Sequence, residues 1–287
     1  MFINLGPPEI GVKCSLKECI KLAKRTGFLG VDVDIYEAGK LVAERGVEYV
    51  KNLFIENEIQ VGGWIWFDDF GFETDDDTFG SYLRELPSLA TIAEKIGATR
   101  VLSWILPYSD ELNYDQNFKL HDNRVREAAK ILNDYGQKLA LEYIGPKTFR
   151  LDHKYPFVYD LKGALELIHN TGSENVGLIM DSWHWYTSDA TLDDIKKLPS
   201  DLAIYVHLSD APANVSVDQQ VDHIRCLPGS TGVVNNVGFL KALYEIGYNG
   251  PITAEPFSEE IKSLPDEEGA RITANALIEI MKQAGLS

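Results

Sequence analysis

Short apolar runs alternate with amphipathic stretches along this whole sequence, and the alternation limits the fold more than any other feature. Each apolar run is short enough to be one buried strand, and each amphipathic stretch has the spacing of a helix with one buried face. Repeated strand–helix units of this kind build a parallel sheet. Eight such units fit the 287 residues as one closed barrel. The sequence therefore predicts an α/β protein with a single (β/α)8 barrel domain over residues 1–287.

The predicted elements follow the chain in regular order. Strands are expected at Phe2–Leu5, Val31–Ile35, Ile59–Trp66, Arg100–Ile105, Lys138–Ile144, Val176–Asp181, Ala203–Leu208 and Ile252–Glu255. Helices are expected at Leu16–Thr26, Gly39–Asn57, Tyr82–Ile96, Asp115–Tyr135, Leu161–Asn170, Thr191–Leu198, Asn236–Ile246 and Asp266–Ala284.

Four polar residues end the short apolar runs of the predicted fifth to eighth strands: Glu142, Asp181, His207 and Glu255. A single carboxylate at a strand end often caps the next helix instead of binding a ligand. Four together at one mouth of a barrel converge on one point, because parallel strands end on the same side. Three oxygen donors and one nitrogen predict a divalent-metal site, with Mn²⁺ favoured and Mg²⁺, Co²⁺ and Zn²⁺ as alternatives.

Two further polar residues are predicted to bind a substrate in this mouth. His184 follows Asp181 by three residues and is well placed to donate a hydrogen bond to a substrate oxygen. Arg225 carries a guanidinium just before a Leu-Pro-Gly turn. The ordinary interpretations are that His184 is a packed histidine and that Arg225 is a surface arginine. The sequence alone does not exclude either of them.

Loop charges and strand-end aromatic residues complete the predicted substrate-binding set. Lys147 and Arg150 follow the fifth strand and suit an anionic or heavily oxygenated substrate, although solvated loop charges explain them equally well. Trp66 and Trp104 are predicted to line the pocket, where an aromatic ring can stack on a sugar. Alternation along the third strand puts Trp64 and Trp66 on one side of it, and the barrel interior is one candidate.

Composition limits the partners and the compartment. The formal net charge of −17 opposes binding to a nucleic-acid backbone. No apolar run reaches the length of a membrane span, and the N-terminus lacks the pattern of a signal peptide. Cys14, Cys19 and Cys226 are too few and too irregularly spaced for a disulfide framework or a zinc motif. The sequence predicts a cytoplasmic protein with reduced thiols and a small-molecule partner.

The strand-end residues and their neighbours resemble those of the xylose isomerase-like TIM barrels, the sugar phosphate isomerases and epimerases. Within that group the sequence looks most like ketose 3-epimerases and inosose dehydratases. The matching motifs are Leu141-Glu142, Met180-Asp181 with His184, Val206-His207-Leu208, Arg225 with Leu227-Pro228-Gly229, and Gly247–Gly250 leading to Glu255-Pro256-Phe257.

The resemblance implies a role for each matching residue. It implies that Glu142, Asp181, His207 and Glu255 bind the metal and that the two glutamates act as the acid/base pair. It also implies that His184 and Arg225 hold substrate oxygens. One departure is Thr148, which stands where ketose 3-epimerases usually carry a sugar-binding glutamate.

Several functions remain open at this point. The favoured function is a metal-dependent isomerase or epimerase that acts on a sugar, keto-sugar or cyclitol through an enediolate. A metal-dependent lyase, either an inosose-type dehydratase or a 3-keto-glycoside-cleaving enzyme, would use the same residues. An endonuclease IV-like repair enzyme and a non-catalytic sugar sensor are less favoured, because of the acidic charge and the complete set of four ligands. A homo-oligomer is compatible with the sequence, but no feature of it decides the oligomeric state.

Overall fold

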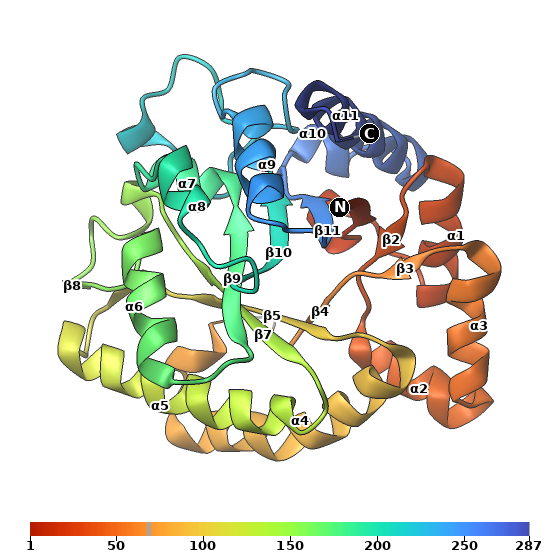
Figure 1. Ribbon diagram of the computed structural model, residues 1–287, viewed down its shortest axis with the longest axis horizontal. Helices are drawn as coiled ribbons and strands as arrows, with labels where there is room; N and C mark the ends of the chain where they lie inside the picture. Colours follow the sequence, from red (N-terminus) through yellow and green to blue (C-terminus); the bar gives the residue numbers. More distant parts are fainter. Residues whose placement is uncertain (68–69, 287) are drawn as a thin grey trace.

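A curled parallel sheet with helices around its outside forms the centre of the computed structural model, which describes residues 1–67 and 70–286 (Figure 1). Asp68, Asp69 and Ser287 of the predicted 1–287 domain lie outside the described residues. The strands, in spatial order, are β3 (Gln60–Val61), β2 (Gly30–Val31), β1 (Phe2–Leu5), β11 (Pro251–Ala254), β10 (Ala203–Leu208), β9 (Val176–Asp181), β7 (Lys138–Tyr143), β5 (Arg100–Ile105) and β4 (Trp64–Ile65).

Two glycines, Gly62 and Gly63, divide the predicted third strand into β3 and β4 and close the sheet. Gly62 N donates to Val31 O at 2.9 Å on the β2 side, and Trp66 N donates to Leu102 O at 3.1 Å on the β5 side. A Cβ atom on Gly62 would lie 2.3 Å from Asp32 Oδ1, so this close approach requires glycine. With β3 and β4 taken as one strand, the nine strands form an eight-stranded barrel. The predicted (β/α)8 TIM-barrel fold is confirmed.

The helices agree with most of the predicted positions. Gly46 divides the predicted Gly39–Asn57 helix in two, and Asp34 caps a helix that begins where the second strand was expected to continue. Two short helices were not predicted, one directly after β9 and one shortly before the last long helix. The helices are α1 (Leu16–Thr26), α2 (Ile35–Arg45), α3 (Val47–Asn57), α4 (Asp76–Ile96), α5 (Tyr114–Asn133), α6 (Leu161–Thr171), α7 (Ser182–Thr187), α8 (Leu192–Lys196), α9 (Asn236–Glu245), α10 (Glu259–Lys262) and α11 (Asp266–Ala284).

Shorter elements lie in the loops between these helices and strands. They are the 3-10 helices η1 (Pro8–Ile10), η2 (Gly71–Glu73), η3 (Lys147–Phe149) and η4 (Val217–Gln219), and the antiparallel pair β6 (Tyr108–Ser109) and β8 (Tyr155–Pro156).

Two hydrophobic layers hold the barrel together. The inner layer fills the barrel below its mouth with Leu102, Ala140, Ile179, Ile204 and Tyr205, against which Ile65 packs. The outer layer lies between the sheet and the helices. It contains both Trp64 and Trp66, so the suggestion that these two side chains face the barrel interior is wrong. Ile65 between them takes the inward position, because neighbouring side chains on a strand alternate.

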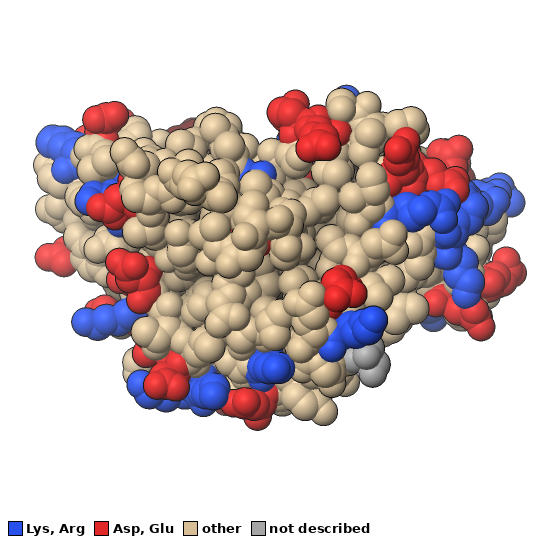
Figure 2. Space-filling model, turned by 90° about the horizontal axis from the view of Figure 1, so that it is seen from above, with Lys and Arg blue, Asp and Glu red and all other residues tan. Residues whose placement is uncertain are grey.

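Charged side chains of both signs lie around the margin of the face shown in Figure 2, and the middle of that face is mostly uncharged. Across residues 1–67 and 70–286, every helix falls short of the length and apolar character that a bilayer crossing needs.

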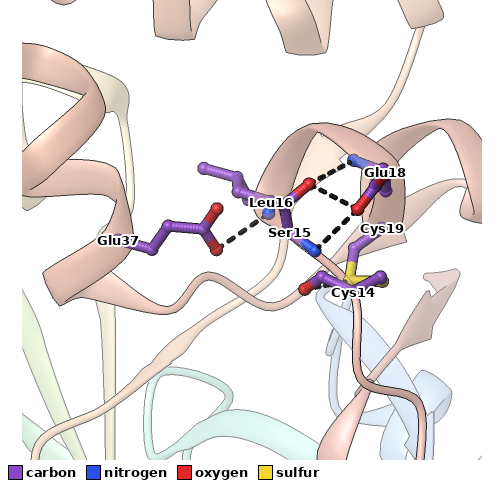
Figure 3. Close-up of a disulfide and its surroundings, with 6 residues drawn as sticks. All are labelled: Cys14, Ser15, Leu16, Glu18, Cys19 and Glu37. Carbon is purple, nitrogen blue, oxygen red and sulfur yellow. Dashed lines mark hydrogen bonds between the residues drawn. A yellow bond between two sulfur atoms is a disulfide. The ribbon is translucent and has the colours of Figure 1, made fainter. Parts of the chain in front are cut away.

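A disulfide joins Cys14 to Cys19 at the start of α1 (Figure 3). The expectation of three reduced thiols is therefore wrong for this pair, and Cys226 alone is free. Five residues of separation allow the bond because the chain turns into the helix at Ser15, which accepts from Glu18 N as the N-cap. Glu37 of α2 accepts from Leu16 N at 2.8 Å and ties the same turn to the next helix.

Removing this bond is expected to lower the free energy of unfolding. A bridge that closes so short a loop restricts the unfolded chain and contributes about 2 kcal/mol in the chain-entropy description. Urea denaturation of the Cys14→Ser/Cys19→Ser double variant measures the loss, and Cys226→Ser is the matched control with the disulfide intact. An unchanged urea midpoint in the double variant would contradict the prediction.

Candidate metal centre

The four predicted metal ligands come together at the carboxyl ends of neighbouring strands. Glu142 lies near the end of β7, Asp181 and His207 pair with each other across β9 and β10, and Glu255 directly follows β11. One potential ligand atom from each residue lies within 4.8 Å of the others. All four side chains are buried, with 2–7% of each residue exposed. This donor set, three carboxylates and one imidazole, fits a divalent cation.

Hydrogen bonds and charge link the four side chains to one another. His207 Nδ1 donates to Glu142 Oε1 at 2.9 Å and lies 3.8 Å from Glu255 Oε2. Burial is the main cause that raises the pKa of Glu142 to about 8; the charge of His207 opposes this rise, and repulsion from Glu255 adds a smaller contribution to it. Burial lowers the pKa of His207, but Glu255 and Glu142 outweigh it and hold that pKa well above its usual value. The carboxylates thus lie close enough to repel each other unless a cation separates them.

Arg225 supplies positive charge to this group from the loop before α9. Its Nη1 donates to Asp181 Oδ2 at 2.9 Å and to Glu255 Oε2 at 2.6 Å, and its Nη2 donates to Asp222 Oδ1 at 2.9 Å. Burial disfavours the charge, but Asp222, Glu255 and Asp181 together raise the pKa of the guanidinium above its usual value. Arg225 therefore stays charged, and its side chain is only 1% exposed.

His184 presents a hydrogen-bond donor beside Arg225. Asp181 caps α7 and accepts from His184 N at 3.2 Å, which fixes the start of the helix. His184 Nδ1 accepts from Gly145 N at 3.1 Å. Burial is the main cause that lowers the pKa of His184, to about 3, so the ring is neutral and its proton sits on Nε2. Nε2 lies 3.3 Å from Arg225 Nη2. Both atoms are donors, so the pair can serve one substrate oxygen.

A cavity of about 460 Å³ opens onto these side chains. Its volume suits a molecule of sugar size. Trp104, which pairs with Glu142 across β5 and β7, forms part of its wall as predicted. The lining residues used below are Glu9, Asp32, Ile65, Leu102, Trp104, Glu142, His184, His207, Asp222, Arg225, Glu255 and Phe257.

A family model described as the xylose isomerase-like TIM barrel matches residues 20–280 of the chain. The chain belongs to this family. The solved structure of a xylose isomerase domain protein from Alicyclobacillus acidocaldarius superposes with a TM-score of 0.88, at 29% identity and 99% coverage of both chains. The IolI protein with a bound zinc atom gives a TM-score of 0.81 at 18% identity, again with 99% coverage of both chains, and at that identity the likeness shows the fold alone.

Curated proteins named for different reactions are similar to the chain. An inosose isomerase of Halalkalibacterium halodurans is 28% identical over 161 residues, 56% of this chain and 54% of that protein, so the match spans about half the relative's length. A 3-dehydroshikimate dehydratase of Pseudomonas aeruginosa is 32% identical over 108 residues, 37% of this chain and 17% of that protein. The chain is therefore similar both to a protein named as an isomerase and to one named as a dehydratase.

Three of the predicted substrate-binding residues lie outside the cavity wall of this family member. Trp66 stacks on Phe67, with ring centroids 4.0 Å apart, in the outer hydrophobic layer. Lys147 is half exposed and pairs with Asp218 at 2.7 Å. Arg150 donates to Gly145 O at 2.6 Å, and its guanidinium lies over the Tyr159 ring.

Three acidic residues of the cavity wall were missed in the sequence. Glu9 lies on η1 after β1, Asp32 follows β2, and Asp222 precedes Arg225 by three residues. Glu9 and Asp32 follow the first and second strands, so they carry the same strand-end signal as the four ligands. The prediction used this signal only on the last four strands, so it did not include Glu9 and Asp32. Burial, followed by repulsion from Glu255, raises the pKa of Glu9 to about 8.

The metal-free protein is expected to lose stability between about pH 6.5 and about pH 8.5. The folded-state pKa values of Glu142 and Glu9, about 8, lie above the ordinary 4.5, so the stability linked to their protons is lost as pH rises toward 8. The lowered pKa of His184 has the opposite sign, but its ordinary value of 6.5 lies at the lower edge of this window, so most of its effect falls below pH 6.5.

Thermal denaturation in a chelator at both pH values measures this effect. Added Mn²⁺ should raise the melting temperature more at the higher pH, because metal binding needs deprotonated ligands. Glu142→Gln should show a weaker pH dependence than the unmodified protein. Equal melting temperatures of the metal-free protein at the two pH values would contradict the prediction.

Proposed function

We propose that this chain is a divalent-metal-dependent enzyme that isomerises or epimerises a sugar, keto-sugar or cyclitol through an enediolate. The observation that carries the proposal is the convergence of Glu142, Asp181, His207 and Glu255 on one point, with three of them in the wall of a cavity of sugar size. These four residues would hold the ion, with Mn²⁺ favoured by their oxygen-rich donor set. The family and the similar inosose isomerase support the proposal.

The roles of the individual side chains follow from their positions. A bound divalent ion would polarise a ketone and stabilise negative charge on its oxygen. Glu142 and Glu255, on two different strands, would remove the proton from the carbon beside the ketone and return it to the same or the neighbouring carbon. His184 Nε2 and Arg225 Nη2 would donate to a substrate oxygen, and Trp104 would lie against the carbon skeleton. Proton return to the same carbon gives epimerisation, and return to its neighbour gives isomerisation.

A metal-dependent lyase is the second candidate, and the similarity to 3-dehydroshikimate dehydratase supports it. The same proton removal would start the reaction, and a β-hydroxyl group would then leave as water instead of the proton returning. We expect a small sugar-like molecule as the partner of either enzyme. A cytoplasmic location, the absence of nucleic-acid binding and a homo-oligomeric state stay predictions. Trp66, Lys147 and Arg150 lie outside the cavity wall, so their positions do not support the predicted contacts with a substrate.

Metal-dependent exchange of a carbon-bound proton tests the proposal. The purified protein is analysed for metal, stripped with a chelator and supplied separately with Mn²⁺, Mg²⁺, Co²⁺ or Zn²⁺ in D₂O. Ketohexoses, inososes and 3-keto-glycosides are then followed by NMR. Exchange beside the ketone that requires the metal supports enediolate chemistry, and a product lacking one water identifies a lyase. A protein that neither retains nor responds to any of these ions would contradict the proposal.

A further inference from the structure

Three carboxyl groups beyond the metal ligands, those of Glu9, Asp32 and Asp222, lie in the otherwise mostly apolar wall of the cavity. Glu9 and Asp32 adjoin Glu255 around the barrel mouth, because β1 and β2 follow β11 in the sheet. We propose that the cavity selects a neutral polyhydroxylated substrate and rejects anionic ones, with Glu9 and Asp32 as the residues that bind its hydroxyl groups. The proposal rests on the function proposed above and narrows its substrate class.

The charges around the cavity favour this selection. Arg225 is the one Lys or Arg side chain of the described residues in the cavity wall, and its guanidinium already donates to three carboxylates. With a divalent ion bound, three positive charges would face six carboxyl groups: Glu9, Asp32, Glu142, Asp181, Asp222 and Glu255. The carboxylates remain in excess even when Glu9 is protonated. A phosphate or carboxylate on the substrate would add to this excess negative charge.

The positive groups that could recognise an anion are engaged elsewhere. Lys147 pairs with Asp218, and Arg150 donates to the Gly145 carbonyl; neither side chain belongs to the cavity wall. The first amides of α7 point to the Asp181 side chain, which accepts from Trp183 N and His184 N. Phosphate groups in proteins are usually held by free guanidinium groups, lysines or helix amides. Of these groups, the described part of the cavity wall offers only Arg225, which keeps one N–H of Nη2 for a substrate oxygen while its charge already faces three carboxylates.

Glu9 and Asp32 instead offer acceptors for hydroxyl groups. Asp32 is held in place by Tyr205 Oη, which donates to Oδ2 at 2.6 Å, and by Gly63 N, which donates to Oδ1 at 2.7 Å. Asn4 Nδ2 adds a third bond, to Oδ1 at 3.0 Å. The Glu9 carboxyl group has no hydrogen bond to any described residue and remains free for a ligand. A carboxylate oxygen can accept more than one hydrogen bond, so both residues can take a sugar hydroxyl.

Paired substrates that differ in charge test the proposal on the Mn²⁺-loaded protein. The pairs are a ketohexose with its 6-phosphate ester, and an inosose with 3-dehydroshikimate. Ligand binding is measured by thermal shift, and proton exchange in D₂O is measured in parallel. We expect the neutral member of each pair to bind at least tenfold more tightly than the anionic member. Equal or tighter binding of the anionic members, or no binding by any neutral one, would overturn the proposal.

Binding and exchange separate this proposal from the reaction proposed above. A neutral ligand that binds without proton exchange would support the substrate class and contradict the enediolate reaction. Glu9→Gln should weaken binding of the neutral members about tenfold, because the amide has one acceptor oxygen where the carboxyl group has two. Glu9→Lys should shift the preference toward the anionic members. Glu44→Gln, an exposed change of the same charge on α2, is the matched control. Unchanged selectivity in both Glu9 variants would remove Glu9 from the proposal.

Discussion

Glu142→Gln and Glu255→Gln are each expected to lower the rate of proton exchange beside the substrate ketone by about 100- to 10,000-fold, the usual contribution of a positioned acid or base. An amide cannot take up or return a proton at neutral pH. Both side chains lie in the cavity on different strands, so neither can replace the other. NMR of the reaction in D₂O at saturating Mn²⁺ measures the loss.

Asp181→Asn is the control that separates metal binding from proton transfer. Asn caps helices well, so the start of α7 should persist. Asp181 offers a ligand atom to the metal but does not belong to the cavity wall. Its variant should therefore lose activity at low metal concentration and recover much of it at saturation. If a glutamate variant recovered in the same way, its role would be metal binding alone.

Arg225→Met is expected to lower the free energy of unfolding of the metal-free protein by about 3–5 kcal/mol, the typical effect of leaving a buried charge without its partner. The guanidinium is 1% exposed and bridges Asp181, Glu255 and Asp222. Its removal leaves these carboxylates facing one another in a buried site. Urea denaturation in a chelator measures the loss.

Arg25→Met makes the same substitution at an exposed ion pair and serves as the control. Arg25 lies 3.3 Å from Glu267, and both side chains are about half exposed, so the expected loss is about 1 kcal/mol or less. Saturating Mn²⁺ should stabilise Arg225→Met more than the unmodified protein, because the ion supplies some of the lost positive charge. Equal losses in the two variants would show that Arg225 adds no more than a surface pair.

The sequence predicted best where strands are long and continuously apolar. The expected bounds of β1, β5, β9 and β10 agree with the structure, because buried parallel strands read as unbroken apolar runs. The second and third predicted strands were too long. Asp34 caps α2 inside one of them, and the Gly62–Gly63 pair divides the other. The cap is a local contact of Asp34 with Tyr36 N and Glu37 N. The close approach at Gly62, by contrast, depends on Asn4 and Asp32, which are distant in sequence.

The candidate site was predictable in part for the same reason. Parallel register brings strand-end side chains to one mouth, so the meeting of Glu142, Asp181, His207 and Glu255 follows from their positions on strands. Loop residues lack such a register. Lys147 and Arg150 therefore could not be placed from the sequence, and the bond between Cys14 and Cys19 depends on the turn into α1.

The hydrophobic layer beneath the cavity also determines the route by which substrate enters and product leaves. Leu102, Ile179, Ile204 and Tyr205 are at most 4% exposed and fill the barrel across its width, so there is no passage between them through the described structure. Substrate must then enter, and product must leave, through the same mouth of the barrel. A product bound in the mouth blocks the next substrate, so product inhibition of the proposed reaction should be competitive with respect to substrate.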